Sequence, residues 1–149
     1  MPSGNGWKKK WNMLDKRTRT STLLDAAIRE MELIVTISGR IQDPADFGSS
    51  LDGLVVFRAC GMSLQYVTES FVKIRNLGLA DLFKAYPGIP WKHVFGMRNF
   101  LSHDYGEVDE EGIFNTVKEN IPELLETSRK MKADLDGGRF DVLFTEEKG

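Results

Sequence analysis

One segment near the middle of the chain gathers side chains that could carry out chemistry. It runs from Arg98 to Gly106 as Arg-Asn-Phe-Leu-Ser-His-Asp-Tyr-Gly, so a permanent cation, an imidazole and a phenol fall within a few residues of one another. Arginine stays charged at physiological pH and can bind a phosphate through two nitrogens. Histidine can accept and release a proton near neutrality. Together they suit cleavage of a phosphodiester without a metal, in which one residue moves protons and the other neutralises charge on phosphorus.

The spacing of these residues does not by itself bring the arginine and the histidine together. On a regular helix, Arg98 and His103 are separated by a rotation of ~140° and a rise of ~7.5 Å. Arg98 shares a face with Ser102 and Tyr105, whereas Asn99 lies one turn before His103. The two could converge if the helix loosens, if the arginine stem bends, or if a second copy lies across a two-fold axis. From spacing alone we favour a structural role, with a surface cation and a histidine that eases the helix dipole.

Other kinds of site are less well supported by the sequence. His93 and His103 lie ~15 Å apart along a straight helix, which is too far to share a metal ion. Gly106 belongs to no glycine-rich phosphate loop. The acidic run at 107–111 is typical of a helix start and a solvated face. We therefore expect neither a metal nor a cofactor.

Composition limits the classes of function. The 149 residues suggest a single domain with one core. The net charge is -2, so any contact with RNA would have to be local and not spread over a basic surface. Cys60, which has no second cysteine to pair with, is expected to be a core thiol in a reducing compartment. No apolar run reaches the ~20 residues of a membrane span, and no secretory signal is present, so we expect a cytoplasmic protein without a membrane partner.

The elements that must position the segment are all predicted to be helices. Apolar residues recur at spacings of three and four, and Asp43-Pro44, Asn76 and Gly78 provide stops. Pro90 suits the first helical position of the third major helix, and Asp109 suits the cap of the next one. Pro122 is expected to kink or restart that segment, and Gly137-Gly138 to end it. The predicted ranges are 19–41, 51–75, 79–86, about 90 to beyond 101, and 109 to about 135.

The predicted architecture is an all-α, up-and-down bundle of four to five helices. Residues 1–16 are interpreted as a flexible basic N-terminal arm, residues 17–136 as the helical domain and residues 137–149 as a C-terminal tail. The stretch 140–144 is expected to dock as an apolar tail, since almost no convincing strand is present.

The segment at 98–106 resembles a known signature. Arg98, four residues, His103, one residue and Tyr105 resemble the motif of HepT-like proteins, small ribonuclease toxins in the HEPN superfamily. The likeness extends through Ile-Pro-Trp-Lys-His-Val-Phe-Gly-Met-Arg-Asn at 89–99. It continues at Asp109 and at 117–119 and 121–124, and covers roughly residues 20 to 132.

The resemblance implies a HEPN-like homodimer in which the two motifs face each other across a cleft. It implies metal-independent cleavage of RNA with Arg98 and His103 as catalytic residues. The ribose 2′-OH would be the nucleophile, leaving a 2′,3′-cyclic phosphate and a 5′-hydroxyl. The accessory candidates beside the catalytic pair are Asn99, Ser102 and Asp104.

The resemblance also implies a partner. Family members are typically encoded beside a small nucleotidyltransferase antitoxin, which in characterised pairs transfers AMP to the motif tyrosine, here Tyr105. A nucleotide on that phenol would place negative charge near Arg98 and block entry of RNA.

The chain departs from its relatives at two places. Phe100 stands where many relatives have a basic residue, and the Gly-Glu-Ala-like segment of their second helix is matched here to Leu64-Gln65-Tyr66, without an acid. Two alternatives to the nuclease therefore stay open. One is a non-catalytic helical partner, or substrate-binding subunit, of a small nucleotidyltransferase. The other is a HEPN-type scaffold, which would be favoured if Arg98 were buried in an internal salt bridge.

Overall fold

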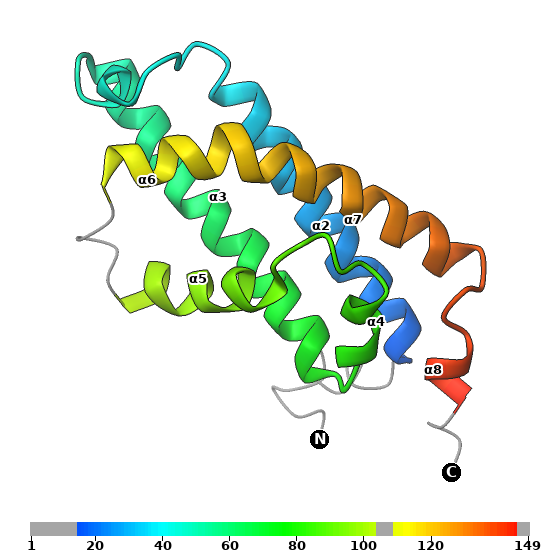
Figure 1. Cartoon of the computed structure of the whole chain (residues 1–149). Coiled ribbons are helices and arrows are strands. Elements are labelled where there is room, and N and C mark those ends of the chain that lie inside the picture. The colour runs from blue at the N-terminus through cyan, green and yellow to red at the C-terminus, as the bar shows by residue number, and fades with distance from the viewer. Residues whose placement is uncertain (1–14, 104–108, 146–149) are drawn as a thin grey trace, which may run out of the picture.

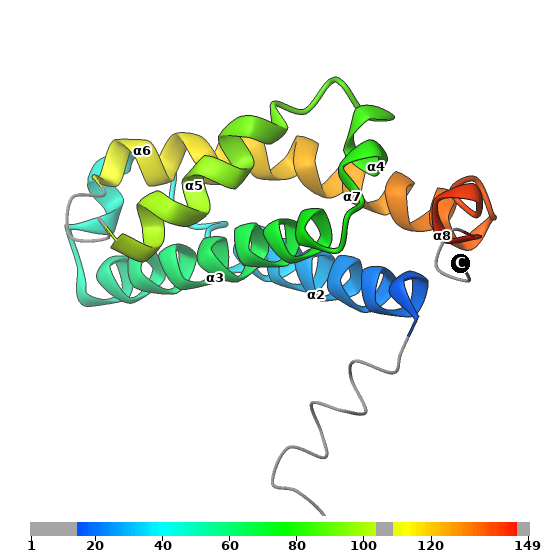
Figure 2. The same cartoon turned by 90° about the horizontal axis from the view of Figure 1, so that it is seen from below.

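The computed structural model describes residues 15–103 and 109–145, with only the backbone described at 102 and 103. These residues form helices and their connections without any strand, which confirms the all-α prediction. Helices α2 (Lys16–Ile37) and α3 (Leu51–Asn76) form one layer. Helices α5 (Trp91–His103), α6 (Glu110–Asn115) and α7 (Ile121–Asp136) form a second layer over it (Figures 1 and 2). No helix in the described ranges has the length and hydropathy to span a lipid bilayer.

Helix α2 begins earlier and ends earlier than predicted. Asp15 caps it by accepting a hydrogen bond from the Thr18 N–H at 2.7 Å, so the helix starts within the predicted N-terminal arm. It ends at Ile37 and not at residue 41. Ile41 keeps the apolar period and is 4% exposed, but it packs into the core from the connection after the helix. The apolar period therefore predicted the burial of Ile41 correctly and the end of the helix wrongly.

Helix α3 matches its predicted range to within one residue. The prediction rested on an apolar series that begins at Phe57. Phe57 is partly buried, and the later members, Cys60, Leu64, Val67, Phe71 and Ile74, are buried. Cys60 is confirmed as a buried thiol, and burial raises its pKa to about 11. A buried neutral thiol behaves as a small apolar side chain.

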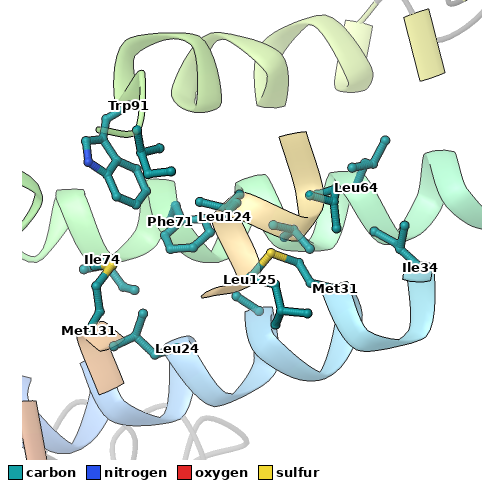
Figure 3. Packing of buried hydrophobic residues seen from close by; sticks show 14 of the residues in the cluster. Leu24, Met31, Ile34, Leu64, Phe71, Ile74, Trp91, Leu124, Leu125 and Met131 are labelled. Atoms are coloured by element: carbon teal, nitrogen blue, oxygen red, sulfur yellow. The ribbon is translucent and has the colours of Figure 1, made fainter. Parts of the chain in front are cut away.

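Side chains from three long helices and from the start of α5 meet in one core. Figure 3 shows them pointing toward one another between the α2, α3 and α7 ribbons. Most of these side chains are almost fully enclosed, so truncating one would leave a cavity. The labelled members are Leu24, Met31, Ile34, Leu64, Phe71, Ile74, Trp91, Leu124, Leu125 and Met131.

The predicted interruption near Pro122 is a widened turn. α6 continues through a π-helical segment, Thr116–Asn120, into α7. Proline cannot donate a backbone hydrogen bond and crowds the preceding turn, which a wider turn accommodates. The segment also carries Lys118, whose Nζ donates to the Ser38 carbonyl at 2.8 Å and so ties it to the end of α2. Asp109 caps α6 as predicted, accepting from the Gly112 N–H at 2.6 Å.

The predicted short helix at 79–86 is α4 (Ala80–Lys84). Pro90 directly precedes α5 and does not open it as its first residue; its carbonyl accepts from the Val94 N–H at 3.2 Å. After α7, Gly138 has a φ of +89°, in the region that favours glycine. The chain then docks Phe140 in the core, as predicted for the tail, and continues as the helical turn α8 (Val142–Thr145).

Candidate active site

Helix α5 carries the motif and is anchored to the bundle at both ends. At its start, Trp91 is 9% exposed, and its ring centroid lies 5.4 Å from that of Phe71 and 4.7 Å from that of Phe83. The indole Nε1 donates to the Tyr86 carbonyl at 2.9 Å. Near its end, Leu101 is buried. These contacts fix α5 against α3, so the residues between the anchors have a defined place.

Arg98 lies between those anchors and is held by an acid on α3. Its Nε lies 2.6 Å from Oε2 of Glu69, and its Nη1 donates to Oδ1 of Asn99 at 3.1 Å. The ion pair lowers the pKa of the Glu69 carboxyl and raises the pKa of the Arg98 guanidinium, in each case mainly through their hydrogen bond. Both groups are therefore charged at neutral pH.

This ion pair is not buried. The side chains of Arg98 and Glu69 are 34% and 31% exposed. Among the described residues no group is bonded to Nη2 of Arg98, and Nη1 has a second hydrogen. The terminal edge of the guanidinium can therefore bind a phosphate in a bidentate manner while Glu69 holds Nε. A scaffold role would be favoured by a buried internal salt bridge. The salt bridge is internal, but its side chains are partly exposed.

Glu69 is a partner of the motif arginine that the sequence analysis missed. In the sequence, the acid-bearing segment of relatives was matched to residues 64–66, which left the role of that acid in doubt. In the structure an acid three residues further along the helix reaches the motif arginine. A signal was present: Glu69 is the only charged residue between Arg58 and Lys73. An isolated charge on a helix that is otherwise apolar or neutral suggests a specific partner.

The remaining candidates are tested only in part. Asn99 is exposed and contacts Arg98. His103 is the last residue of α5, but the side chains of Ser102 and His103, and all of Asp104 and Tyr105, lie outside the described residues. The structure thus joins Arg98 with Asn99 and Glu69. Whether the imidazole joins them stays a prediction.

The described ranges contain no group of three or more His, Cys, Asp or Glu side chains arranged to hold a metal ion. The side chain of Phe100 is 43% exposed. It lies beside Lys92, His93, Gly96 and Met97 along an open hollow on the outer side of α5.

Comparison with known proteins places the chain among ribonuclease-like sequences. The family model described as Ribonuclease HepT-like matches residues 27–131, well over half of the chain. No solved structure matches with significance.

Individual relatives agree with the family match. A protein of Methanocaldococcus jannaschii named "Putative RNase MJ1216" is 35% identical over 50% of this chain and 58% of its own length. Another from that organism, "Putative RNase MJ0125", is 31% identical over 61% of this chain and 75% of its own. "Probable ribonuclease HepT" of Thermococcus cleftensis is 34% identical over 47% of this chain and 60% of its own. The chain thus spans less than two thirds of the first and third of these relatives.

Proposed function

The chain belongs to the HepT-like ribonuclease family, and we propose that it is a metal-independent endoribonuclease, the toxin of a toxin–antitoxin pair. The observation that carries this proposal is the state of Arg98. It is charged, partly exposed and held through Nε, with a terminal edge left to bind a phosphate. The names of the relatives support RNA as the substrate.

The proposed reaction uses the nucleophile that RNA already carries. A base removes the proton of the 2′-OH, the 2′ oxygen bonds to phosphorus, and the bond from phosphorus to the 5′ oxygen breaks as that oxygen takes up a proton. His103 is the proposed proton carrier and Arg98 neutralises the charge that builds on the phosphoryl oxygens. The products are a 2′,3′-cyclic phosphate and a 5′-hydroxyl.

A homodimer is part of the proposal, and the outer face of α3 supports it. Four apolar side chains spaced by four, seven and four residues lie on one side of this helix, and each is more than half exposed. They are Leu51, Val55, Met62 and Tyr66. Glu69 follows one turn later and contacts Arg98. A second copy docked on this row would bring its own arginine and histidine toward the same cleft.

This row offers its own test. Met62→Glu places a charge in the middle of the apolar row at an exposed position, so the fold should survive. We expect a dimeric wild type and a monomeric variant by light scattering, with cleavage reduced in the variant. A variant that stays dimeric would assign the contact to another face.

The proposal extends to a nucleotidyltransferase antitoxin and to the cytoplasm as the place of action. In such a pair the antitoxin would transfer AMP from ATP to the phenol oxygen of Tyr105 and release pyrophosphate. The added phosphate would compete for Arg98 and exclude RNA.

The deciding experiment incubates purified protein with RNA in the presence of EDTA and identifies the product ends. We expect cleavage to persist and His103→Ala to lower the rate by about 10²- to 10⁴-fold, the usual contribution of a general acid–base. Equal activity in that variant, or no cleavage by the wild type, would reject the nuclease. The second outcome would favour the non-catalytic partner of a nucleotidyltransferase.

A further inference from the structure

Gly96 sits in the interior of α5, and no described part of the molecule requires a glycine there. A Cβ built at this position meets no described atom within 4 Å, and Gly96 is not among the glycines with a positive φ. Gly53 on α3 differs, because a Cβ there would collide with the Asp46 carbonyl oxygen. Glycine weakens a helix interior relative to alanine. The close approach of Asp46 accounts for Gly53, whereas no contact among the described residues accounts for Gly96, which leaves the exposed side of α5 as the place for any role it has.

Gly96 forms the floor of an exposed hollow. Lys92 precedes it by one turn, Phe100 follows by one turn, and His93 and Met97 complete the lining. Lys92, Gly96 and Phe100 have the four-residue spacing that places them along one side of the helix. The hollow runs toward the end of α5 at which the motif lies.

The charges of α5 fit an anionic occupant. Its 13 residues include Lys92 and Arg98 but no aspartate or glutamate, whereas α2, α3 and α7 each carry acids. Lys92 is exposed, and no carboxylate among the described residues pairs with it. Because Arg98 is paired with Glu69, the positive charge on the outer side of α5 is that of Lys92, and α5 carries no acid to offset it. Phe100 adds an exposed ring on which a base can stack.

We propose that the outer face of α5 binds the single-stranded RNA that flanks the cleaved linkage, with Lys92 on a phosphate, Phe100 under a base, and Gly96 allowing the strand to approach the helix backbone. Lys92 and Phe100 are eight residues apart, which is about 12 Å along the helix axis. That length accommodates roughly three stacked nucleotides at about 3.4 Å each. The inference rests on the proposed function, since it assigns the substrate's path to the same site.

The test measures binding of a 2′-O-methyl RNA oligonucleotide of about ten residues, which cannot be cleaved because it lacks the 2′-OH nucleophile. Gly96→Gln replaces glycine by a good helix former, so the melting temperature should rise or hold while RNA binding weakens. A loss of binding with a gain of stability cannot come from misfolding. Phe100→Ala should weaken binding about fivefold or more. Lys92→Ala should lower the dependence of log affinity on log salt by about one unit.

Two matched controls lie away from α5. Gly88→Ala alters an exposed loop glycine whose Cβ also meets nothing, and Lys84→Ala removes an exposed cation from α4. Both should bind like the wild type. Gly96→Gln and Lys92→Ala could also bind RNA like the wild type while the wild type cleaves RNA. In that case the RNA follows another path, and the proposed nuclease function is unaffected. If the α5 variants instead change the oligomeric state, this face contacts a second copy. If the wild type neither binds nor cleaves RNA, the proposed ribonuclease function itself is wrong.

Discussion

Arg139 and Arg98 are two of the described arginines that pair with carboxylates, and their surroundings differ. Arg139, after the end of α7, has Nη1 2.7 Å from Oδ2 of Asp134, and its guanidinium carbon lies 5.4 Å from the Tyr86 ring centroid and 5.2 Å from that of Phe140. Arg98 pairs with Glu69 and the neighbouring Asn99, and no described ring lies over its guanidinium.

The difference is between an arginine that packs against aromatic rings and the arginine that we propose for the RNA site. The contacts of Arg139 join the residues before α5, helix α7 and the tail, and Tyr86 also donates its hydroxyl proton to Asp134. This network closes one end of the bundle. The contacts of Arg98 orient the guanidinium, and no described residue is bonded to its Nη2. A salt bridge alone does not distinguish the two arginines. What distinguishes them is that Arg139 lies over aromatic rings, whereas no described ring lies under the guanidinium of Arg98.

Between these two regions, the largest expected effect on cleavage comes from removing Arg98. Arg98→Ala should lower RNA cleavage by about 10²- to 10³-fold, as expected when a donor to developing charge is lost. Arg139→Ala should leave cleavage unchanged and lower the melting temperature slightly. Steady-state cleavage and thermal unfolding of both variants check the contrast. If the Arg98→Ala protein cleaved RNA at the normal rate, neither arginine would be required for cleavage.

A smaller effect on cleavage is expected at Glu69. Glu69→Gln keeps the shape of the side chain but removes the charge that holds Nε, so cleavage should fall by about tenfold, the usual size of a charge-assisted hydrogen bond. Glu32→Gln is the matched control, because it breaks the interhelical pair with Arg129, away from the motif. Faster cleavage by Glu69→Gln would instead mean that the acid competes with the phosphate.

Substitutions in the network of Tyr86, Asp134, Arg139 and Phe140 should change stability but not cleavage. Tyr86 is 9% exposed, and both burial and the hydrogen bond to Asp134 raise the pKa of its hydroxyl. Tyr86→Phe should lower the free energy of unfolding by about 1–1.5 kcal/mol through loss of that bond. Urea unfolding measures this loss. A change in cleavage would show that the two regions are coupled.

The smallest expected effect is the pH dependence of stability. Because the pKa of Glu69 is lowered from 4.5, its stabilising contribution is complete above pH 4.5 and is lost as the pH falls through the lowered value. The wild type should thus exceed Glu69→Gln in stability at pH 7 by less than about 1 kcal/mol, since the pair is partly exposed. At pH 3 the difference should be smaller. A difference that grows in acid would contradict the assigned ion pair.

The sequence predicted the parts of this molecule that depend on local pattern. Apolar spacing identified the buried face of α3 and the buried Cys60, and residue type identified the Asp109 cap. The end of α2 was missed because Ile41 keeps the helical period after the chain has left the helix.

What the sequence could not predict depends on contacts between distant residues. Glu69 and Arg98 are 29 positions apart, and no local spacing links them. The open surface around Gly96 likewise became visible only once the neighbouring helices were in place. The meeting of Arg98 with the imidazole of His103 stays a prediction, because that side chain lies outside the described residues.

The most direct measurement is the affinity of wild type, Arg98→Ala and Arg139→Ala for the 2′-O-methyl RNA over a series of salt concentrations. If Arg98 binds a phosphate, its removal lowers the slope of log affinity against log salt by about one unit, while Arg139→Ala keeps the wild-type slope. Equal slopes in all three proteins would contradict the assignment of Arg98 to the RNA site.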